Sequence, residues 1–493
     1  MRNEKTAFAG VLACALALSL SAAARPQTKV LFYADTEDYT CDYSNDGIRD
    51  IARTFEAEGV KCCFNITGYL ALRIQELGRR DVIDALKSHT LGIQTLYHTR
   101  HPTPAEVADD PSYERAYRRA LRDEAMAVGM VEAVFGEGRV VFTCPPGTSV
   151  SPSMMEAHHD LGMIFGAGNG YSSVSGIGGL VVRPGNEVDG LWYFNLYQAS
   201  YNAQINLDHF IPGNGEIKAG DRTIPDWKPY LDEMAKLDFV GIGSHPNMQG
   251  HKQFWDKVNY DRGNLVPWRQ WKEAERRDPA DTAQYYRLVT SFIRAIKADG
   301  RFRITNFDEM IKGVRPRVAI TPADLAVIRT ALAKDFNCIR EPASWCVSDV
   351  FQAVVKFLRG ETTHMPGKVY GFLSRPVGVA ETTEVSAAGL RAAAAKIDLS
   401  TFLPPQIEVD GRLIGPADFL YAALEVLTTG AEKVKISPRE QLGSFKEVKA
   451  LEKANLAGSW LHVPEFKDRY VTERLRLQLW TLRIDPVDYD AAK

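Results

Sequence analysis

Short apolar runs alternate with stretches of helical spacing from about residue 28 to about residue 314. The apolar runs predict buried strands at residues 30–34, 60–66, 91–97, 139–143, 239–242 and 302–304. The stretches between them predict amphipathic helices at residues 47–58, 69–87, 113–135, 153–161 and 280–298. Strands that alternate with helices predict βα units around a parallel sheet or barrel, in which functional side chains gather at the carboxyl ends of the strands.

One segment inside this region has a different composition. Residues 168–226 are rich in glycine, asparagine, serine and aromatic residues, among them Trp192 and Tyr193. This composition predicts long loops or a small β insertion that could form the wall of a groove.

The pattern changes again after about residue 316. Thr321-Pro322-Ala323-Asp324 has the features of a helix start, with threonine as N-cap and proline in the first turn. Residues 415–420 repeat nearly the same letters, and residues 348–351 are a weaker echo. We therefore expect a first domain at 28–315 and a second, mostly helical domain with degenerate repeats at 316–493.

The amino terminus has the features of a secretory signal peptide. Arg2 and Lys5 precede an apolar run at residues 7–20, and small residues follow up to Ala24, which predicts a signal peptide at 1–24. Lipidation at Cys14 is the alternative. The run is shorter than a membrane span, and no later segment is apolar enough for one. We therefore expect a secreted or periplasmic protein without an integral membrane span.

Composition narrows the class of protein. Of 493 residues, 45% are hydrophobic and 25% are charged, which is typical of globular chains and excludes wholesale disorder. A formal net charge of −3 provides no basic field for nucleic acid. Export permits disulfides, and Cys338 with Cys346 is the best candidate pair. Cys62 and Cys63 are expected to be small buried side chains on opposite faces of a strand.

Polar groups follow the first and the third predicted strand. Asp35, Glu37 and Asp38 would repel one another unless a cation or a proton lay among them, so a cation site beside a general base would explain them. A solvated acidic loop is the alternative. His98 and His101 could complete a metal site with a carboxylate, or could belong to an ordinary surface loop.

Two later strand ends are also candidates. Residues 142–147 form a strand that ends in a rigid turn at Pro145, which could be only a turn. His245 directly follows a predicted strand, where it could be a general acid or a structural residue. The chain has no Gly-x-Ser-x-Gly elbow of a serine hydrolase, and the glycines at 166–170 lack the context of a dinucleotide site.

The order of these features resembles polysaccharide deacetylases of the NodB-homology type, carbohydrate esterase family 4. Residues 59–64 are similar to the family's usual second strand, residues 154–163 to its helix followed by Leu-Gly, and residues 303–310 to its usual closing strand and helix. The resemblance covers roughly residues 28–314. It implies an α/β fold, a deformed (β/α) barrel, with a divalent metal, usually zinc, held by an Asp-His-His set.

The resemblance also implies roles for individual residues. Asp38 matches the metal ligand, Glu37 the general base and His98 the second ligand. Gln94 stands where the family has its first histidine, and His101 is the other candidate for the third ligand.

Three departures from the family pattern have chemical consequences. A Gln94 carbonyl is a weaker donor for zinc than an imidazole. The family's Arg-x-Pro motif reads Thr143-Cys144-Pro145 here, so the arginine that orients the base is missing. Glu37 is one methylene longer than the usual aspartate. Pro145, Trp192 and Tyr193 are the predicted substrate contacts.

The implied reaction is metal-assisted deacetylation. The metal would bind the acetyl carbonyl oxygen and a water, Glu37 would take a proton from that water, and His245 would protonate the departing amine. The prediction is an exported, metal-dependent hydrolase of N-acetyl or O-acetyl groups on a polysaccharide or cell-wall glycan. The alternatives are a non-catalytic glycan-binding protein that kept the barrel, and a hydrolase of another amide or ester.

The second domain has a resemblance of its own. Residues 407–411 and the helix start at 416–420 loosely resemble pseudomurein-binding-type repeats. The resemblance implies docking onto cell-wall glycan. A domain that only packs against the barrel is the alternative.

Overall fold

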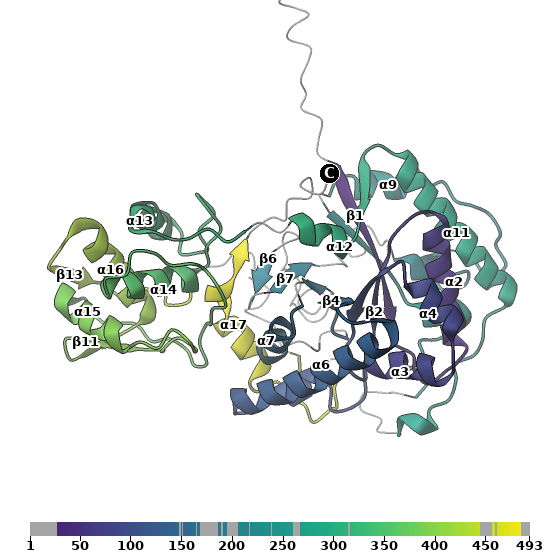
Figure 1. The fold of residues 1–493 in the computed structure, drawn as a ribbon, viewed down its shortest axis with the longest axis horizontal. Coiled ribbons are helices and arrows are strands. Elements are labelled where there is room, and N and C mark those ends of the chain that lie inside the picture. Colours follow the sequence, from purple (N-terminus) through teal and green to yellow (C-terminus); the bar gives the residue numbers. More distant parts are fainter. Residues whose placement is uncertain are drawn as a thin grey trace, which may run out of the picture.

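The computed structural model has a ten-stranded sheet flanked by helices, with a smaller helical region beside it (Figure 1). The structure describes residues 27–146, 149, 151–163, 165–167, 186–188, 191–194, 206–215, 217–237, 239–259, 267–313, 316–443, 456–458 and 461–484. The predicted signal peptide and Cys14 lie outside these residues. Among the described residues, the structure has no helix that is long and apolar enough to cross a membrane.

The sheet has the order β14-β6-β7-β5-β4-β3-β2-β1-β8, and β9 also pairs with β1. Its strands are β1 (Thr28–Thr36), β2 (Cys63–Ile66), β3 (Thr90–Ile93), β4 (Val140–Thr143), β5 (Phe165–Ala167), β6 (Asn186–Val188), β7 (Leu191–Phe194), β8 (Phe239–Ser244), β9 (Phe302–Thr305) and β14 (Arg483–Ile484). All pairs from β9 through β7 are parallel, and only β6 and β14 are antiparallel additions at the edge. With its helices, this parallel sheet forms the predicted α/β fold of the deformed-barrel type.

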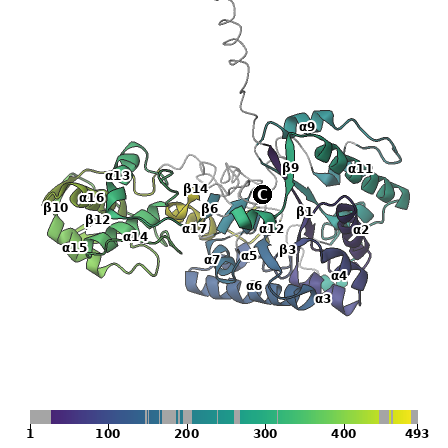
Figure 2. The same ribbon diagram turned by 45° about the horizontal axis from the view of Figure 1, so that its top comes forward.

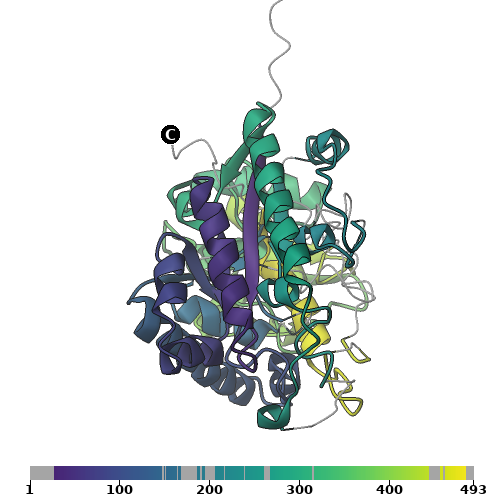
Figure 3. The ribbon, with the colours of Figure 1, turned by 90° about the vertical axis from the view of Figure 1, so that its right-hand side faces the viewer.

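Helices follow most strands and cover the outer face of the sheet. They are α2 (Ser44–Ala57), α3 (Gly68–Glu76), α4 (Arg80–Leu86), α5 (Pro104–Ala108), α6 (Tyr113–Phe135), α7 (Pro152–Asp160), α9 (Lys228–Met234), α10 (Pro246–Gly250), α11 (Pro279–Ala298) and α12 (Phe307–Met310). Figure 3 shows β1 between α2 and α11. Ile48, Ile51 and Phe55 form the buried face of α2, and the Phe55 ring lies 5.1 Å from that of Phe32 on β1.

β1 is buried on both faces, and its side chains point alternately to the outside and to the inside of the barrel. Val30, Phe32 and Ala34 belong to the large outer core, whereas Leu31 and Tyr33 belong to a small inner core with Phe142 and Phe307. Gly243 on β8 lies against Tyr33, and a Cβ at this position would be only 2.4 Å from the Tyr33 hydroxyl. The inner face is therefore closely packed below its carboxyl end.

Two predicted elements differ from the observed ones. The helix predicted at 69–87 is two helices, because Gly78 takes a left-handed conformation (φ 65°) that ends α3 before α4 begins. The strand predicted at 91–97 ends at Ile93, after which the chain turns away from the sheet with left-handed backbone at Thr95 and His98.

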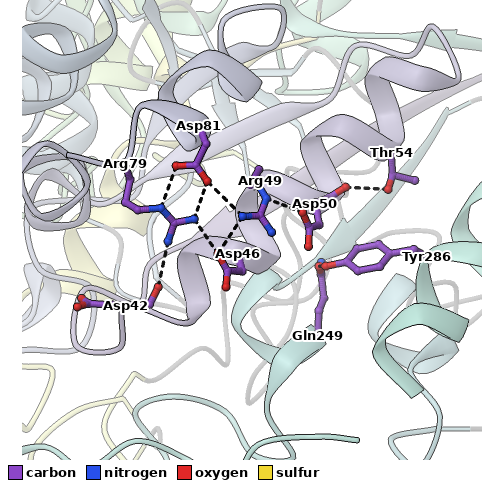
Figure 4. A network of polar contacts seen from close by, with 9 residues as sticks. All are labelled: Asp42, Asp46, Arg49, Asp50, Thr54, Arg79, Asp81, Gln249 and Tyr286. Atoms are coloured by element: carbon purple, nitrogen blue, oxygen red, sulfur yellow. Dashed lines mark hydrogen bonds and ion pairs between the residues drawn. The ribbon is translucent and has the colours of Figure 1, made fainter. Parts of the chain in front are cut away.

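A network of arginine and aspartate side chains joins α2 to the turn between α3 and α4 (Figure 4). Arg79 contacts Asp46 at 2.7 Å and Asp81 at 2.8 Å, and Arg49 contacts Asp81 at 3.2 Å. Hydrogen bonds from these two arginines hold the pKa of Asp81 well below its usual range, although burial opposes this. This network braces the outside of the barrel near the start of α2.

The helical region after residue 316 lies beside the barrel (Figure 2). It contains α13 (Leu325–Lys334), α14 (Val347–Leu358), α15 (Ala387–Lys396) and α16 (Pro416–Thr429), with two small antiparallel sheets of β10 (Thr383–Ser386) with β13 (Lys433–Ile436) and β11 (Ile407–Val409) with β12 (Arg412–Ile414).

The echoed helix starts share one local structure. Asp324, Asp349 and Asp418 each accept a hydrogen bond from the backbone N–H three residues earlier, at 2.8, 2.9 and 3.0 Å. Each of these bonds satisfies a backbone donor at a helix start. The similar letters in the sequence therefore encode the same cap three times.

The predicted Cys338–Cys346 disulfide is wrong: neither cysteine forms a disulfide, and both are buried. The Cys346 thiol lies at the start of α14, where its sulfur accepts a hydrogen bond from the Asp349 N–H at 3.3 Å. Cys62 and Cys63 are buried in the outer and the inner core respectively, as predicted.

The last described segment, residues 461–484, contacts both the barrel and the helical region. β14 pairs with β6, and Arg483 on β14 makes a buried double contact with Asp349 at 2.7 Å for both pairs of atoms. α17 (Val471–Leu477) lies near α7 in Figure 1, and Arg474 donates to the carbonyl oxygens of Ala108 and Pro111. The boundary at residue 315 stays a prediction, and the contacts of residues 461–484 tie both regions together.

Candidate active site

Polar side chains continue the inner face of the sheet where its hydrophobic residues end. Asp35 follows Leu31 and Tyr33 in the alternation along β1, and its register partner on β2 is Asn65. Cys144 follows Phe142 on β4 in the same way. These groups therefore meet at the carboxyl end of the barrel, where a parallel α/β fold places its chemistry.

The first histidine unit, Asp208–His245–Asp35, lies at this mouth. His245 Nδ1 is 2.5 Å from Asp208 Oδ2, and His245 Nε2 is 3.4 Å from Asp35 Oδ2. Asp208 also accepts from the His245 backbone N–H at 3.0 Å, and Asn65 donates to Asp35 Oδ1 at 2.7 Å. Asp208 thus holds the His245 imidazole through Nδ1, and the opposite nitrogen, Nε2, faces the Asp35 carboxylate.

A short helical turn, η1 (Leu207–Phe210), positions Asp208. Asn206 caps this turn by accepting from the Asp208 N–H at 2.9 Å, and a parallel bridge joins Asn206 to Gly243 of β8. Because His245 comes directly after β8, the acid and the histidine are held by the same strand end.

The charges of this unit follow from its geometry. Burial opposes protonation of His245, but Asp208 and Asp35 outweigh it and hold the His245 pKa well above its usual value. Burial would raise the pKa of Asp35, but its contacts with His245 and Asn65 bring that pKa below the usual value. At neutral pH the unit is therefore an imidazolium beside a carboxylate, a proton donor facing a proton acceptor.

The second histidine unit, Asp256–His98–Glu37, is deeper. His98 Nε2 lies 2.8 Å from Glu37 Oε2, and His98 Nδ1 lies 3.6 Å from Asp256 Oδ2. The Trp255 indole donates to Glu37 Oε1 at 3.1 Å, and the Thr99 hydroxyl donates to Asp256 at 2.8 Å. The Glu37 side chain is 1% exposed and that of His98 is 5% exposed, against 19% for His245.

Burial and the two acids act in opposite directions on this second unit. Burial opposes the charged imidazole, yet Glu37 and Asp256 raise the pKa of His98 to about 9. Burial raises the pKa of Glu37, against the attraction of His98. His98 is consequently a buried cation at neutral pH, and both of its ring nitrogens face acids.

Asp38, the predicted metal ligand, is turned toward its own loop. Its Oδ1 accepts from the Thr40 N–H at 2.9 Å, the Thr40 hydroxyl at 2.8 Å and the Cys41 N–H at 3.1 Å. Its Oδ2 accepts from the Ser44 hydroxyl at 2.5 Å. Burial raises the Asp38 pKa despite these bonds. Both oxygens thus shape the turn into α2.

The other predicted ligands lie apart from Asp38. His101 Nδ1 is 2.8 Å from Glu106, which also accepts from the backbone N–H of Thr103 and of Val463. Gln94 is buried directly after β3. Asp38, His98 and His101 do not form a set of donor atoms within 4.8 Å of one another in the described part of the chain. The predicted donors therefore do not fit a metal ion as a group, and their assignment as ligands stays a prediction.

The predicted substrate contacts are placed only in part. Pro145 is buried just after β4. Trp192 and Tyr193 belong to the backbone of β7, but their side chains lie outside the described residues.

Sequence reasoning assigned no role to four residues that complete the site: Asn65, Asp208, Trp255 and Asp256. Asn65 had a usable signal, because it is the next-to-last residue of the second strand and lies in register with Asp35. Asp208, Trp255 and Asp256 come from connections without regular periodicity, so only tertiary structure brings them to the histidines.

The comparisons with known proteins give similarities of fold at low sequence identity. No family model matches the chain, and no curated protein matches it. A CE4 family pseudoenzyme from Bacillus anthracis is similar over 57% of this chain and 65% of its own, with a TM-score of 0.31 and 12% identity. A family 4 carbohydrate esterase from Streptomyces lividans, in complex with acetate, is similar over 56% of this chain and 90% of its own, with a TM-score of 0.28 and 9% identity.

A third solved structure, Puue allantoinase, is similar over 58% of this chain and 89% of its own, with a TM-score of 0.35 and 12% identity. All three TM-scores lie below 0.5. The chemistry of the site therefore has to follow from the side chains of this chain.

Proposed function

We propose that this chain is an exported hydrolase that removes acetyl groups, on nitrogen or oxygen, from a polysaccharide or cell-wall glycan. The observation that carries the hydrolase proposal is the contact of His245 Nε2 with Asp35 Oδ2 at 3.4 Å at the barrel mouth. The glycan substrate rests on the motif resemblance, as does docking through the region after residue 316. Export rests on the leader at 1–24.

The two groups supply the proton transfers that hydrolysis needs. Asp35 takes a proton from the attacking water, and the imidazolium of His245 gives its Nε2 proton to the departing amine or alkoxide. Asp208 holds the ring through Nδ1 and stabilises its charged form. The proton on Asp35 can then return to Nε2 across their 3.4 Å separation, which restores the starting state.

The deeper unit supports this pair without facing substrate. Glu37, the predicted base, has its two oxygens against His98 and the Trp255 indole. It is carried on the same segment as Asp35, two residues further along. We assign Glu37 and His98 the role of holding that segment in place.

Acetate release tests the proposal. The full chain is incubated with acetylated glucosamine oligomers, acetylated xylan and a chromogenic acetyl ester, and acetate is measured by an enzyme-coupled assay. His245→Gln and Asp35→Asn should lower release by about 10²- to 10⁴-fold when equal amounts of folded protein are compared. His159→Gln, which replaces a partly exposed histidine of α7 that contacts Asp160, is the matched control and should retain activity.

The second candidate is a glycan-binding protein without catalysis. The observation that favours it is the engagement of Asp38 by its own loop and the separation of the predicted ligands. Binding of an acetylated glycan to the unchanged chain, with no acetate released over long incubation, would establish this candidate and exclude the hydrolase.

A further inference from the structure

A second group of metal-binding side chains lies outside the two histidine units. The donor atoms of Cys41, His251 and Glu273 all lie within 4.8 Å of one another. Cys41 Sγ is 3.7 Å from His251 Nε2, and His251 Nε2 is 3.2 Å from Glu273 Oε1. The three residues come from the loop after β1, the end of α10 and the chain before α11.

These separations match the edges of a zinc tetrahedron. Zinc bonds of about 2.3 Å to sulfur and about 2.0 Å to nitrogen and oxygen place sulfur and nitrogen about 3.6 Å apart, and nitrogen and oxygen about 3.3 Å apart. Cysteine, histidine and a carboxylate are also the side chains that zinc prefers. The Glu273 side chain is 37% exposed, so solvent can supply a fourth donor.

The imidazole of His251 is fixed in the orientation that a metal requires. Its Nδ1 lies 2.9 Å from the Asn247 carbonyl oxygen, which can only accept, so Nδ1 carries the proton. In the neutral ring, Nε2 therefore presents its lone pair to Glu273 and Cys41. A carbonyl behind a histidine ligand is the usual support of a metal-binding imidazole.

We propose that Cys41, His251 and Glu273 bind a divalent cation, preferentially zinc, in a site separate from the His245–Asp35 pair. His251 and Arg276, the two ends of one connection, already pair in an antiparallel bridge. The ion would bind beside this bridge and hold the two ends together. That connection carries Trp255 and Asp256 to Glu37 and His98. Cys41 adjoins Asp38 through its backbone N–H. The ion would thus link the loop after β1, which carries Asp38 and Cys41, to the connection that carries Trp255 and Asp256.

One neighbouring charge opposes the ion. Arg276 Nε lies 2.5 Å from Glu273 Oε1, so the arginine competes with a cation for this carboxylate. Arg276→Gln should therefore tighten zinc binding. If His251 and Glu273 instead form only an ion pair with each other, the Arg276→Gln variant should bind no zinc.

The test is calorimetric titration of the metal-stripped full chain with Zn²⁺, with Co²⁺ absorption as the second measurement. We expect one ion per chain and a thiolate-to-cobalt band. Glu273→Gln changes an exposed side chain and should weaken zinc binding by more than about tenfold, since even supporting residues of metal sites carry that much. Cys41→Ser should remove the cobalt band.

Matched controls are Glu275→Gln, an exposed acid two residues away, and Cys338→Ser, a cysteine outside the proposed site with similar burial. Both should bind zinc as the unchanged protein does. Absence of zinc binding would overturn the proposal. It would also be overturned if Asp38→Asn and His98→Gln abolished zinc binding while Cys41→Ser and Glu273→Gln retained it. None of these results depends on acetate release, so the failure of this site and of the proposed hydrolase are separable.

Discussion

His245 and His98 each lie between two carboxylates, one of which comes from the end of β1. Both have a pKa above the usual histidine value for the same electrostatic reason. They differ in access, because the His245 side chain is 19% exposed and that of His98 is 5% exposed. The same arrangement of charges therefore provides a proton donor where substrate can reach it and a structural ion pair where it cannot.

The largest expected difference between the two histidine units is seen when each imidazole is removed in turn. His245→Gln deletes a general acid, which typically contributes 10²- to 10⁴-fold to rate, so acetate release should fall by about that factor. His98→Gln should affect folding first. Initial rates with equal amounts of folded protein measure the first effect, and a His245→Gln chain with unchanged rates would contradict the assignment of the acid.

The second largest effect is the loss of stability in His98→Gln. Glu37 and Asp256 would remain buried without their cation, and breaking a buried pair costs about 3–5 kcal/mol in free energy of unfolding. Urea unfolding followed by tryptophan fluorescence measures this quantity. The matched variant His245→Gln should lose less, because its acids are closer to solvent; equal losses would remove the distinction between the units.

Part of the pH dependence of stability should come from the second histidine unit, and His245, whose pKa is also raised, contributes in the same direction. The His98 pKa rises from about 6.5 in the unfolded chain to about 9 in the folded one, so its stabilisation is complete below pH 6.5 and is lost as pH rises through 9. Urea midpoints at pH 6, 7.5 and 9 should fall in that order. In His98→Gln this decline should be smaller, and an identical decline would assign it to other groups.

The pH dependence of activity should come from the first histidine unit, Asp208–His245–Asp35. Acetate release should decline on the alkaline side when His245 loses its proton, at a pH well above 6.5. Asp208 is the first charge that raises this pKa, so Asp208→Asn should move the alkaline limb to lower pH. The measurement is the pH profile of kcat/KM. A limb that stays in place would show that another group controls it.

The smallest effect is expected at Trp255. Trp255→Phe removes the indole N–H that donates to Glu37 and leaves a buried acceptor unsatisfied, at a cost of about 1–3 kcal/mol in unfolding free energy. Activity per folded molecule should be nearly unchanged, because Trp255 contacts Glu37 and does not contact Asp35 or His245 in the described contacts. Urea unfolding and initial rates on one preparation check both parts.

Local sequence was sufficient for several elements of the fold. The two faces of β1, the repeated aspartate caps at 324, 349 and 418, and the position of His245 after a strand all depend on neighbours within a few residues. The break at Gly78 and the turn after Ile93 were missed, because apolar spacing continues through both while the backbone changes direction.

The sequence by itself determined a parallel α/β region with acids and histidines at its strand ends, because alternation and helical period are local properties of the chain. Only the tertiary structure decided which acid serves which histidine. Asp208 lies 37 residues from His245 in the sequence, and Asp256 lies 158 residues from His98. Both carboxylate oxygens of Asp38 accept hydrogen bonds from its own loop. Pairing and burial set the charge of each group, and both depend on contacts between segments that no local pattern specifies.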